Sequence, residues 1–197
     1  MVGFNYRKAI QALVFFGNKE KGIIHKMKAF KLIWLSDRLH LRRFGRPILN
    51  DVYFALPKGP IPSNTKDLAD NSNFLADSEK ELREISIESR GRFEIKAKTR
   101  VDTQVFSQSD LAIMDEIYTH FGGLSENQLS ELSHFYPEWL KFEHALQAGH
   151  SSRFEMNYQD FFEDAKENNH HIFTENSALL ELNKEFFLEN QIIENLV

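Results

Sequence analysis

The strongest pattern in the chain is a run of apolar side chains at helical spacing between residues 23 and 44. At 100° per residue, one narrow stripe collects Ile23, Met27, Phe30, Trp34 and Leu41, and a second apolar side holds Ile24, Leu35 and Leu39. A helix that is apolar on two sides is typical of the centre of a core. Gly45 readily adopts the left-handed cap conformation and Pro47 prevents continuation, so we expect this helix to end near Phe44.

One acidic residue interrupts the apolar stripe. Asp37 follows Trp34 by three residues and Phe30 by seven, which places its carboxylate on the same buried face. A buried carboxylate needs hydrogen-bond donors, and we expect them from Tyr53, Arg46 or the amides of the following turn. The alternative is a general base whose pKa is raised by burial. The structural role is favoured because no nucleophile or metal motif accompanies Asp37.

The next segment is rich in proline and should form a stiff turn. Pro57, Pro60 and Pro62 remove amide donors and fix φ, so a new helix is expected to start only at Ser63 or Asn64. A short polar helix is predicted over residues 67–77.

A β-hairpin is predicted around Arg90 and Gly91, because apolar and charged residues alternate on both sides of this pair. The inward face of the hairpin is expected to hold Ile85, Ile87, Phe93, Ile95 and Ala97.

Helix caps mark the remaining elements. A first helix is expected over residues 6–17. In the second half, a helix should run from Ser107 or Ser109 to Gly122, and Ser125 with Gln128 forms a capping box for the next one. Pro137 should open a helix that ends before Gly149 and carries Trp139, Phe142 and Leu146 on one face.

The last stretch, residues 177–196, predicts an acidic amphipathic helix. Its apolar positions are Leu180, Phe186, Phe187, Ile192 and Ile193. We expect this helix to dock on the body of the protein, and the alternative is that it projects toward a partner.

Together these elements predict a mainly α fold of the α+β kind: a single compact helical domain with a small antiparallel β-hairpin and a C-terminal amphipathic helix. The domain is expected to span residues 1–155, with residues 156–197 as a helical extension packed on it. A chain of 197 residues is long enough for one such core. Cysteine is absent, and no signal peptide or apolar run of membrane-spanning length is present, so a cytoplasmic protein without a membrane partner is expected.

Charge is distributed unevenly along the sequence. Residues 1–60 carry 12 basic and 3 acidic side chains, residues 61–100 carry 8 of each, and residues 101–197 carry 4 basic and 18 acidic ones, within a net charge of −5. We expect the basic first part to pack on the acidic last part. The alternative keeps both surfaces for partners.

Motifs of known chemistry are not found in the sequence. No His-Glu-x-x-His, nucleophile elbow, phosphate loop or dinucleotide fingerprint occurs, and His170 and His171 lie in a polar connection. The eight histidines are therefore expected to be surface or core residues. We predict no catalytic residues, no cofactor and no metal ion, and hence a protein that is not an enzyme.

The central segment resembles the Panacea domain, a module of antitoxins from bacterial and phage toxin–antitoxin loci. The matching positions of the first block are Lys31, Leu32, Asp37, Gly45, Ile48, Tyr53, Gly59 and Pro60. A second, weaker block runs from Phe106 to Leu111 and from Leu132 through His134 to Trp139. The resemblance covers about residues 5–150, judged by the order and spacing of these blocks.

This resemblance implies an antitoxin that binds and neutralises a cognate protein toxin, through a shared core and a variable interaction surface. Two alternatives remain: an adaptor that delivers the toxin to a housekeeping protease, and a DNA-binding autoregulator. Candidate nucleic-acid contacts are Arg42, Arg43, Arg90 and Arg92, but the basic residues of the long helix are scattered around it, which disfavours this role. His134 is expected to cap or bridge backbone groups at a helix junction, with partner binding as the alternative.

Overall fold

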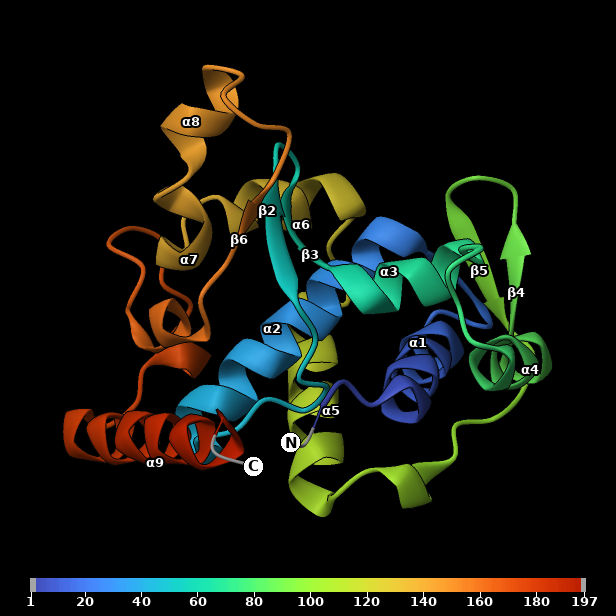
Figure 1. The fold of residues 1–197 in the computed structure, drawn as a ribbon, viewed down its shortest axis with the longest axis horizontal. Coiled ribbons are helices and arrows are strands. Elements are labelled where there is room, and N and C mark those ends of the chain that lie inside the picture. Colours follow the sequence, from blue (N-terminus) through green and yellow to red (C-terminus); the bar gives the residue numbers. More distant parts are fainter. Residues whose placement is uncertain (1–2, 196–197) are drawn as a thin grey trace.

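The computed structural model describes residues 3–195, so Leu196, at the predicted end of the last helix, lies outside it. The long helix predicted for the core is α2 (Lys26–Phe44), which runs through the middle of the molecule (Figure 1). Most of its apolar side chains, among them Trp34, Leu35 and Leu39, are fully buried, which confirms the prediction of a core helix, whereas Met27 is only partly buried and Phe44 is exposed. Gly45 caps the helix in the left-handed conformation, with φ of 65°.

The start of α2 differs from the prediction. The helix begins at Lys26 rather than Ile23, because the preceding residues form strand β1 (Ile23–His25). His25 then acts as the N-cap, since its Nδ1 accepts a hydrogen bond from the Met27 amide at 3.2 Å. The apolar period continues through both elements, so periodicity alone does not separate them.

The first sheet contains the predicted hairpin. β4 (Ile87–Arg90) and β5 (Glu94–Ala97) pair antiparallel, and β1 adds to β5 so that the order is β1-β5-β4. Ile87 and Ile95 are buried as predicted. The inward placement of Ile85 and Phe93 is wrong, since their exposed fractions are 63% and 58%. Ile85 belongs to helix α4 (Asp77–Ser86), and Phe93 lies in the hairpin turn.

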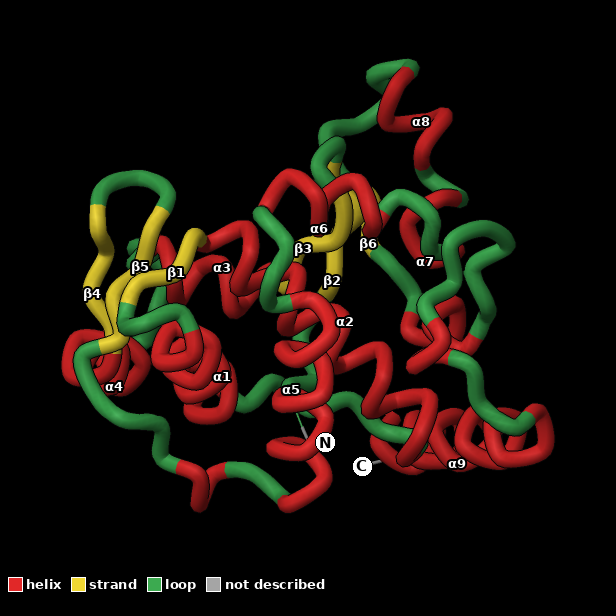
Figure 2. The backbone as a smooth tube through the Cα atoms, turned by 180° about the vertical axis from the view of Figure 1, so that it is seen from behind, coloured by secondary structure: helices red, strands yellow, loops and turns green. Residues whose placement is uncertain are grey.

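The second sheet was not predicted. β2 (Tyr53–Leu56) and β3 (Gly59–Pro62) form a tight hairpin, and β6 (Phe154–Glu155) pairs with the other edge of β2. Two prolines fit in β3 because it is an edge strand, where missing amide donors cost little. The two sheets lie apart, with α3 (Ser63–Asp70) between them, as Figures 1 and 2 both show.

Most of the remaining helices follow the predicted caps. α1 (Tyr6–Lys19), α5 (Gln108–Phe121) and α6 (Glu126–Ser133) form, and α5 and α6 have capping boxes at Ser107 and Ser125. The start of α3 at Ser63 is also confirmed. The helix predicted over residues 67–77 is wrong, since α3 ends at Asp70, where Asn71 takes the left-handed cap, and α4 begins only at Asp77.

Shorter elements complete the chain. Instead of one helix after Pro137 there are two, α7 (Pro137–Leu140) and α8 (Glu143–Gln147). Residues 3–195 also contain three short 3₁₀ helices: η1 (Thr103–Val105), η2 (Tyr158–Phe162) and η3 (His171–Phe173). The fold is mainly helical with small antiparallel sheets, as predicted. Within residues 3–195, no helix is both long and apolar enough to cross a membrane.

The C-terminal helix α9 (Ser177–Asn195) docks against α2 (Figure 1). Its inner face buries Phe187 and packs Leu180 and Leu188 against the core. The Asn183 side-chain amide also donates to the Arg42 carbonyl at 2.8 Å, at the end of α2. Docking on the body is therefore confirmed for this helix. The boundary at residue 155 stays a prediction.

Candidate functional site

Asp37 organises the segment that follows α2. Its carboxylate accepts hydrogen bonds from the amides of Ile48 and Leu49, at 2.8 and 3.1 Å, and from the Tyr53 hydroxyl at 2.9 Å. Tyr53 is thus confirmed as a donor, whereas the two amides come from the segment directly after α2 rather than from the proline-rich turn, and Arg46 instead pairs with Asp110. Burial raises the pKa of Asp37 to about 7, although the three hydrogen bonds favour the charged form. The carboxylate thus ties the β2 strand to the central helix.

Lys31, Gly59 and Pro60 lock the β2–β3 hairpin onto α2. The ammonium group of Lys31 is fully buried and donates to the Pro60 carbonyl at 2.8 Å. Burial lowers the pKa of Lys31 well below its ordinary value. Gly59 has φ of +92°, and a Cβ atom there would overlap the Ser133 hydroxyl and lie 2.5 Å from the Lys31 nitrogen. Only glycine fits this position.

His134 and Trp139 join α6 and α7 to the same hairpin. Their rings stack with centroids 3.8 Å apart and planes 13° apart. The Trp139 indole donates to the Leu56 carbonyl at 2.8 Å, at the end of β2. Burial, and then the charge of Lys31, lower the pKa of His134. His134 is the C-cap residue of α6, so it stands at the helix junction where it was expected.

The motif residues thus form a connected internal scaffold around β2. Their polar groups face backbone carbonyls, amides or one another, and the arrangement fixes the path of the chain from α2 to α7. Sequence reasoning missed a second buried carboxylate, Asp51, which resembles Asp37 in binding backbone amides and a hydroxyl. Asp51 accepts hydrogen bonds from the amides of Asn64 and Thr65 and from the Thr65 hydroxyl. Asp51 lies twelve positions before Ser63, the first residue of the helix it caps, so no local spacing signals it.

Arg42 is not available to a nucleic acid, and its prediction as a contact is wrong. Its guanidinium is fully buried and donates to the carbonyls of Phe161, Phe162 and Phe173 and to the Asp164 carboxylate. Five donors in a fixed plane suit this set of converging carbonyl groups. Arg42 therefore anchors the segment that leads into α9.

Arg43 is likewise occupied by protein groups. It forms a bidentate pair with Glu116, at 2.6 and 3.0 Å, and also binds Glu175 at 2.7 Å. Arg38 makes a fully buried pair with Glu138 at 2.6 Å. The arginines of α2 thus pair with acids of the last part of the chain, as expected from the charge pattern. The lysines of α2 do not: Lys26 pairs with Asp70, Lys28 with Glu20, and Lys31 donates to the Pro60 carbonyl. Arg90 and Arg92 are exposed at the hairpin tip, and their role stays a prediction.

The outer face of α9 is the clearest unpartnered apolar surface within residues 3–195. Four exposed side chains fall on one stripe at helical spacing: Leu179, Leu182, Phe186 and Ile193. Glu181, Glu185 and Glu189 line one flank of the stripe and are also exposed. A cleft of about 300 Å³ opens beside it, bordered by Phe186, Gln191 and residues 45–50. An apolar stripe beside a row of carboxylates is typical of a protein-binding surface.

The fold and its scaffold define a small, mainly helical domain. A family model described as "Antitoxin SocA-like, Panacea domain" matches residues 30–140, which is more than half of the chain. The chain therefore belongs to the SocA-like antitoxin family with a Panacea domain. No curated protein and no solved structure matches it. The match includes the scaffold from Lys31 to Trp139 and ends before α9.

Proposed function

We propose that the protein is a cytoplasmic antitoxin that neutralises a cognate protein toxin by direct binding, without catalysis. Membership of the SocA-like antitoxin family is the observation that carries this proposal. The internal scaffold agrees with it, because Lys31, Asp37 and Trp139 direct their polar groups into the fold. A structural role for these residues leaves the outer surface to select the partner.

We place the toxin on the outer face of α9. The stripe of Leu179, Leu182, Phe186 and Ile193 offers apolar area that the body of the protein does not cover. The adjacent carboxylates of Glu181, Glu185 and Glu189 would attract a basic partner and fix its orientation. The toxin that would fit this face of α9 has an apolar groove bordered by Lys or Arg side chains.

The first experiment expresses the neighbouring reading frames with and without this protein. An adjacent gene should be toxic alone, and co-expression should restore growth and yield a complex in size-exclusion chromatography. Toxin half-life should not change, because binding alone protects the cell. A shorter half-life would favour the adaptor role instead. If no neighbouring product is toxic and rescued, the proposal fails.

A matched pair of variants then tests the surface. Leu179→Gln with Leu182→Gln should reduce toxin affinity at least about 100-fold, because burying each leucine is worth about 1.5 to 3 kcal/mol. The control is Phe74→Gln with Ile85→Gln, which removes two apolar groups that are at least as exposed and lie outside α9. Both variants should melt like the wild type. If the α9 variant folds and still neutralises fully, the toxin binds elsewhere.

A further inference from the structure

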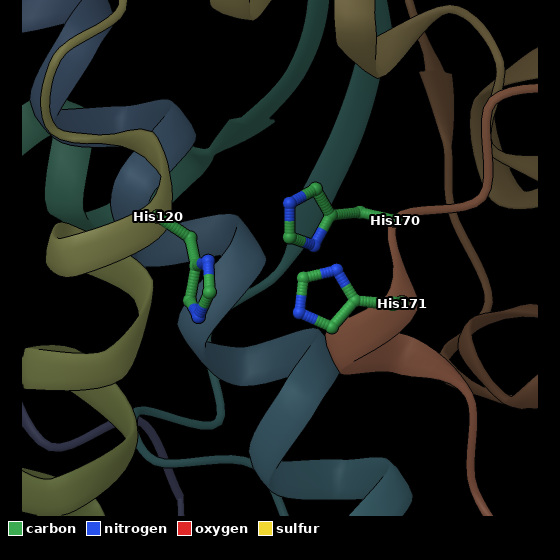
Figure 3. A group of neighbouring side chains, drawn as sticks. All are labelled: His120, His170 and His171. Atoms are coloured by element: carbon green, nitrogen blue, oxygen red, sulfur yellow. The ribbon is translucent and has the colours of Figure 1, made fainter.

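One histidine meets an adjacent pair of histidines from a distant part of the sequence at one point of the surface. His120 lies in the last turn of α5. His170 is the N-cap residue of η3, and His171 is the first residue of η3. Figure 3 shows the three imidazole rings directed toward a shared space. One ring nitrogen from each residue lies within 4.8 Å of the others. His120 and His171 are exposed and His170 is half-buried, so solvent ions can reach the group.

This geometry is close to that of a three-histidine metal site. With zinc–nitrogen bonds of about 2.0 Å, tetrahedral ligand atoms stand about 3.3 Å apart. From separations of at most 4.8 Å, the ring nitrogens need to approach by at most about 1.5 Å, which small rotations of the side chains provide. A fourth position would remain open to water.

The chemistry of the group also favours a cation. No carboxylate belongs to the cluster among the described residues, so all three candidate ligand atoms are imidazole nitrogens. Neutral imidazole is the form that binds metals. The Nδ1 of His170 accepts from the Ile172 amide at 3.5 Å, which leaves Nε2 for an ion.

We propose that His120, His170 and His171 bind a Zn²⁺ ion that clasps the end of α5 to the start of η3. Imidazole nitrogen suits zinc, whereas Mg²⁺ and Ca²⁺ prefer oxygen ligands. The clasp would act on the segment that supplies the Phe173 carbonyl to Arg42 and continues into α9. The sequence did not suggest this site, because 50 residues separate His120 from His170 and no ligand spacing precedes either one.

The test uses the full chain without a polyhistidine tag, stripped with a chelator that is then removed. Titration calorimetry with ZnCl₂ should show one equivalent bound, and excess Zn²⁺ should raise the melting temperature by about 5 °C. MgCl₂ should do neither. His120→Ala and His171→Ala should each weaken Zn²⁺ binding at least about tenfold, as loss of one of three ligands requires.

The matched control is His144→Ala with His150→Ala, which removes two exposed histidines outside the cluster. This variant should bind Zn²⁺ like the wild type. The proposal is overturned if the wild type binds no Zn²⁺ in the micromolar range, if His120→Ala binds as tightly as the wild type, or if the control loses as much affinity. None of these readouts depends on a toxin, so the site and the antitoxin role fail or stand separately.

Discussion

The buried carboxyl of Asp37 should make the stability of the protein depend on pH. Its pKa lies at about 7 in the folded state and near the ordinary 3.8 in the unfolded chain, because burial penalises the charged form. Between these values the folded state binds one more proton than the unfolded state. Stability is therefore full at low pH and falls as pH rises through the folded pKa. The slope has the opposite sign to that of a salt-bridged carboxylate.

The magnitude follows from the same pKa values. Each pKa unit corresponds to about 1.4 kcal/mol, so the Asp37 contribution should fall by about 2.5 kcal/mol between pH 5 and pH 8. Asp37→Asn removes the titrating group but keeps an oxygen that can accept from the amides of Ile48 and Leu49. The free energy of unfolding of the wild type minus that of Asp37→Asn isolates this term from the other titrating groups.

Urea unfolding at pH 5, 6, 7 and 8 provides the assay, with fluorescence from the buried Trp34 and Trp139. The wild-type value minus the Asp37→Asn value should fall by about 1 kcal/mol per pH unit between pH 5 and 7 and level off toward pH 8. A constant difference across this range would refute the reasoning, because Asp37 would then titrate at an ordinary pKa. Asp37→Ala strands three donors and should cost about 3 kcal/mol or more. If it melts like the wild type yet fails to neutralise the toxin, Asp37 is a binding residue instead.

Two further variants test the packing of the scaffold and of α9. Gly59→Ala should destabilise the protein by about 3 kcal/mol, because the new Cβ overlaps Ser133, whereas Gly91→Ala, also at positive φ but in open space, should cost about 1 kcal/mol. Equal costs in urea unfolding would mean that backbone strain, not space, requires glycine. Truncation after Asn176 should lower the melting temperature and promote self-association, since it uncovers the surface that buries Phe187. An unchanged melting temperature and a monomeric product would show that the docking of α9 contributes no stability.

Local sequence signals predicted the elements whose causes are local. The caps at Ser107 and Ser125 and the left-handed Gly45 follow from adjacent residues, and the burial of Asp37 follows from its position on a helical stripe. The β2–β3 hairpin escaped prediction because its prolines normally exclude a strand, and only its place at a sheet edge permits them.

Features that depend on distant partners could not be predicted in this way. Arg42 looked like a surface residue because arginine is rarely fully buried, and the carbonyls that hold it come from residues more than 115 positions later. The three histidines of the proposed zinc site come together only in the folded chain. The charge pattern was the one long-range signal that gave a correct prediction. It predicted contact between the basic first part and the acidic last part of the chain, and ion pairs such as Arg38 with Glu138 and Arg43 with Glu175 join them.

The position of Arg42 links the family scaffold to the surface proposed for the toxin. Arg42 lies inside the matched region, but the carbonyls of Phe161, Phe162 and Phe173 that hold it lie beyond residue 140. A buried guanidinium without these acceptors would be strongly unfavourable. The Arg42 side chain on α2 therefore has its hydrogen-bond acceptors only when the segment from Phe161 to Phe173 is docked. The core of the domain therefore dictates where α9 sits, while the outer residues of α9 are not needed to hold it there. Under the proposed function, this division lets the outer face of α9 change with the partner while the scaffold stays the same.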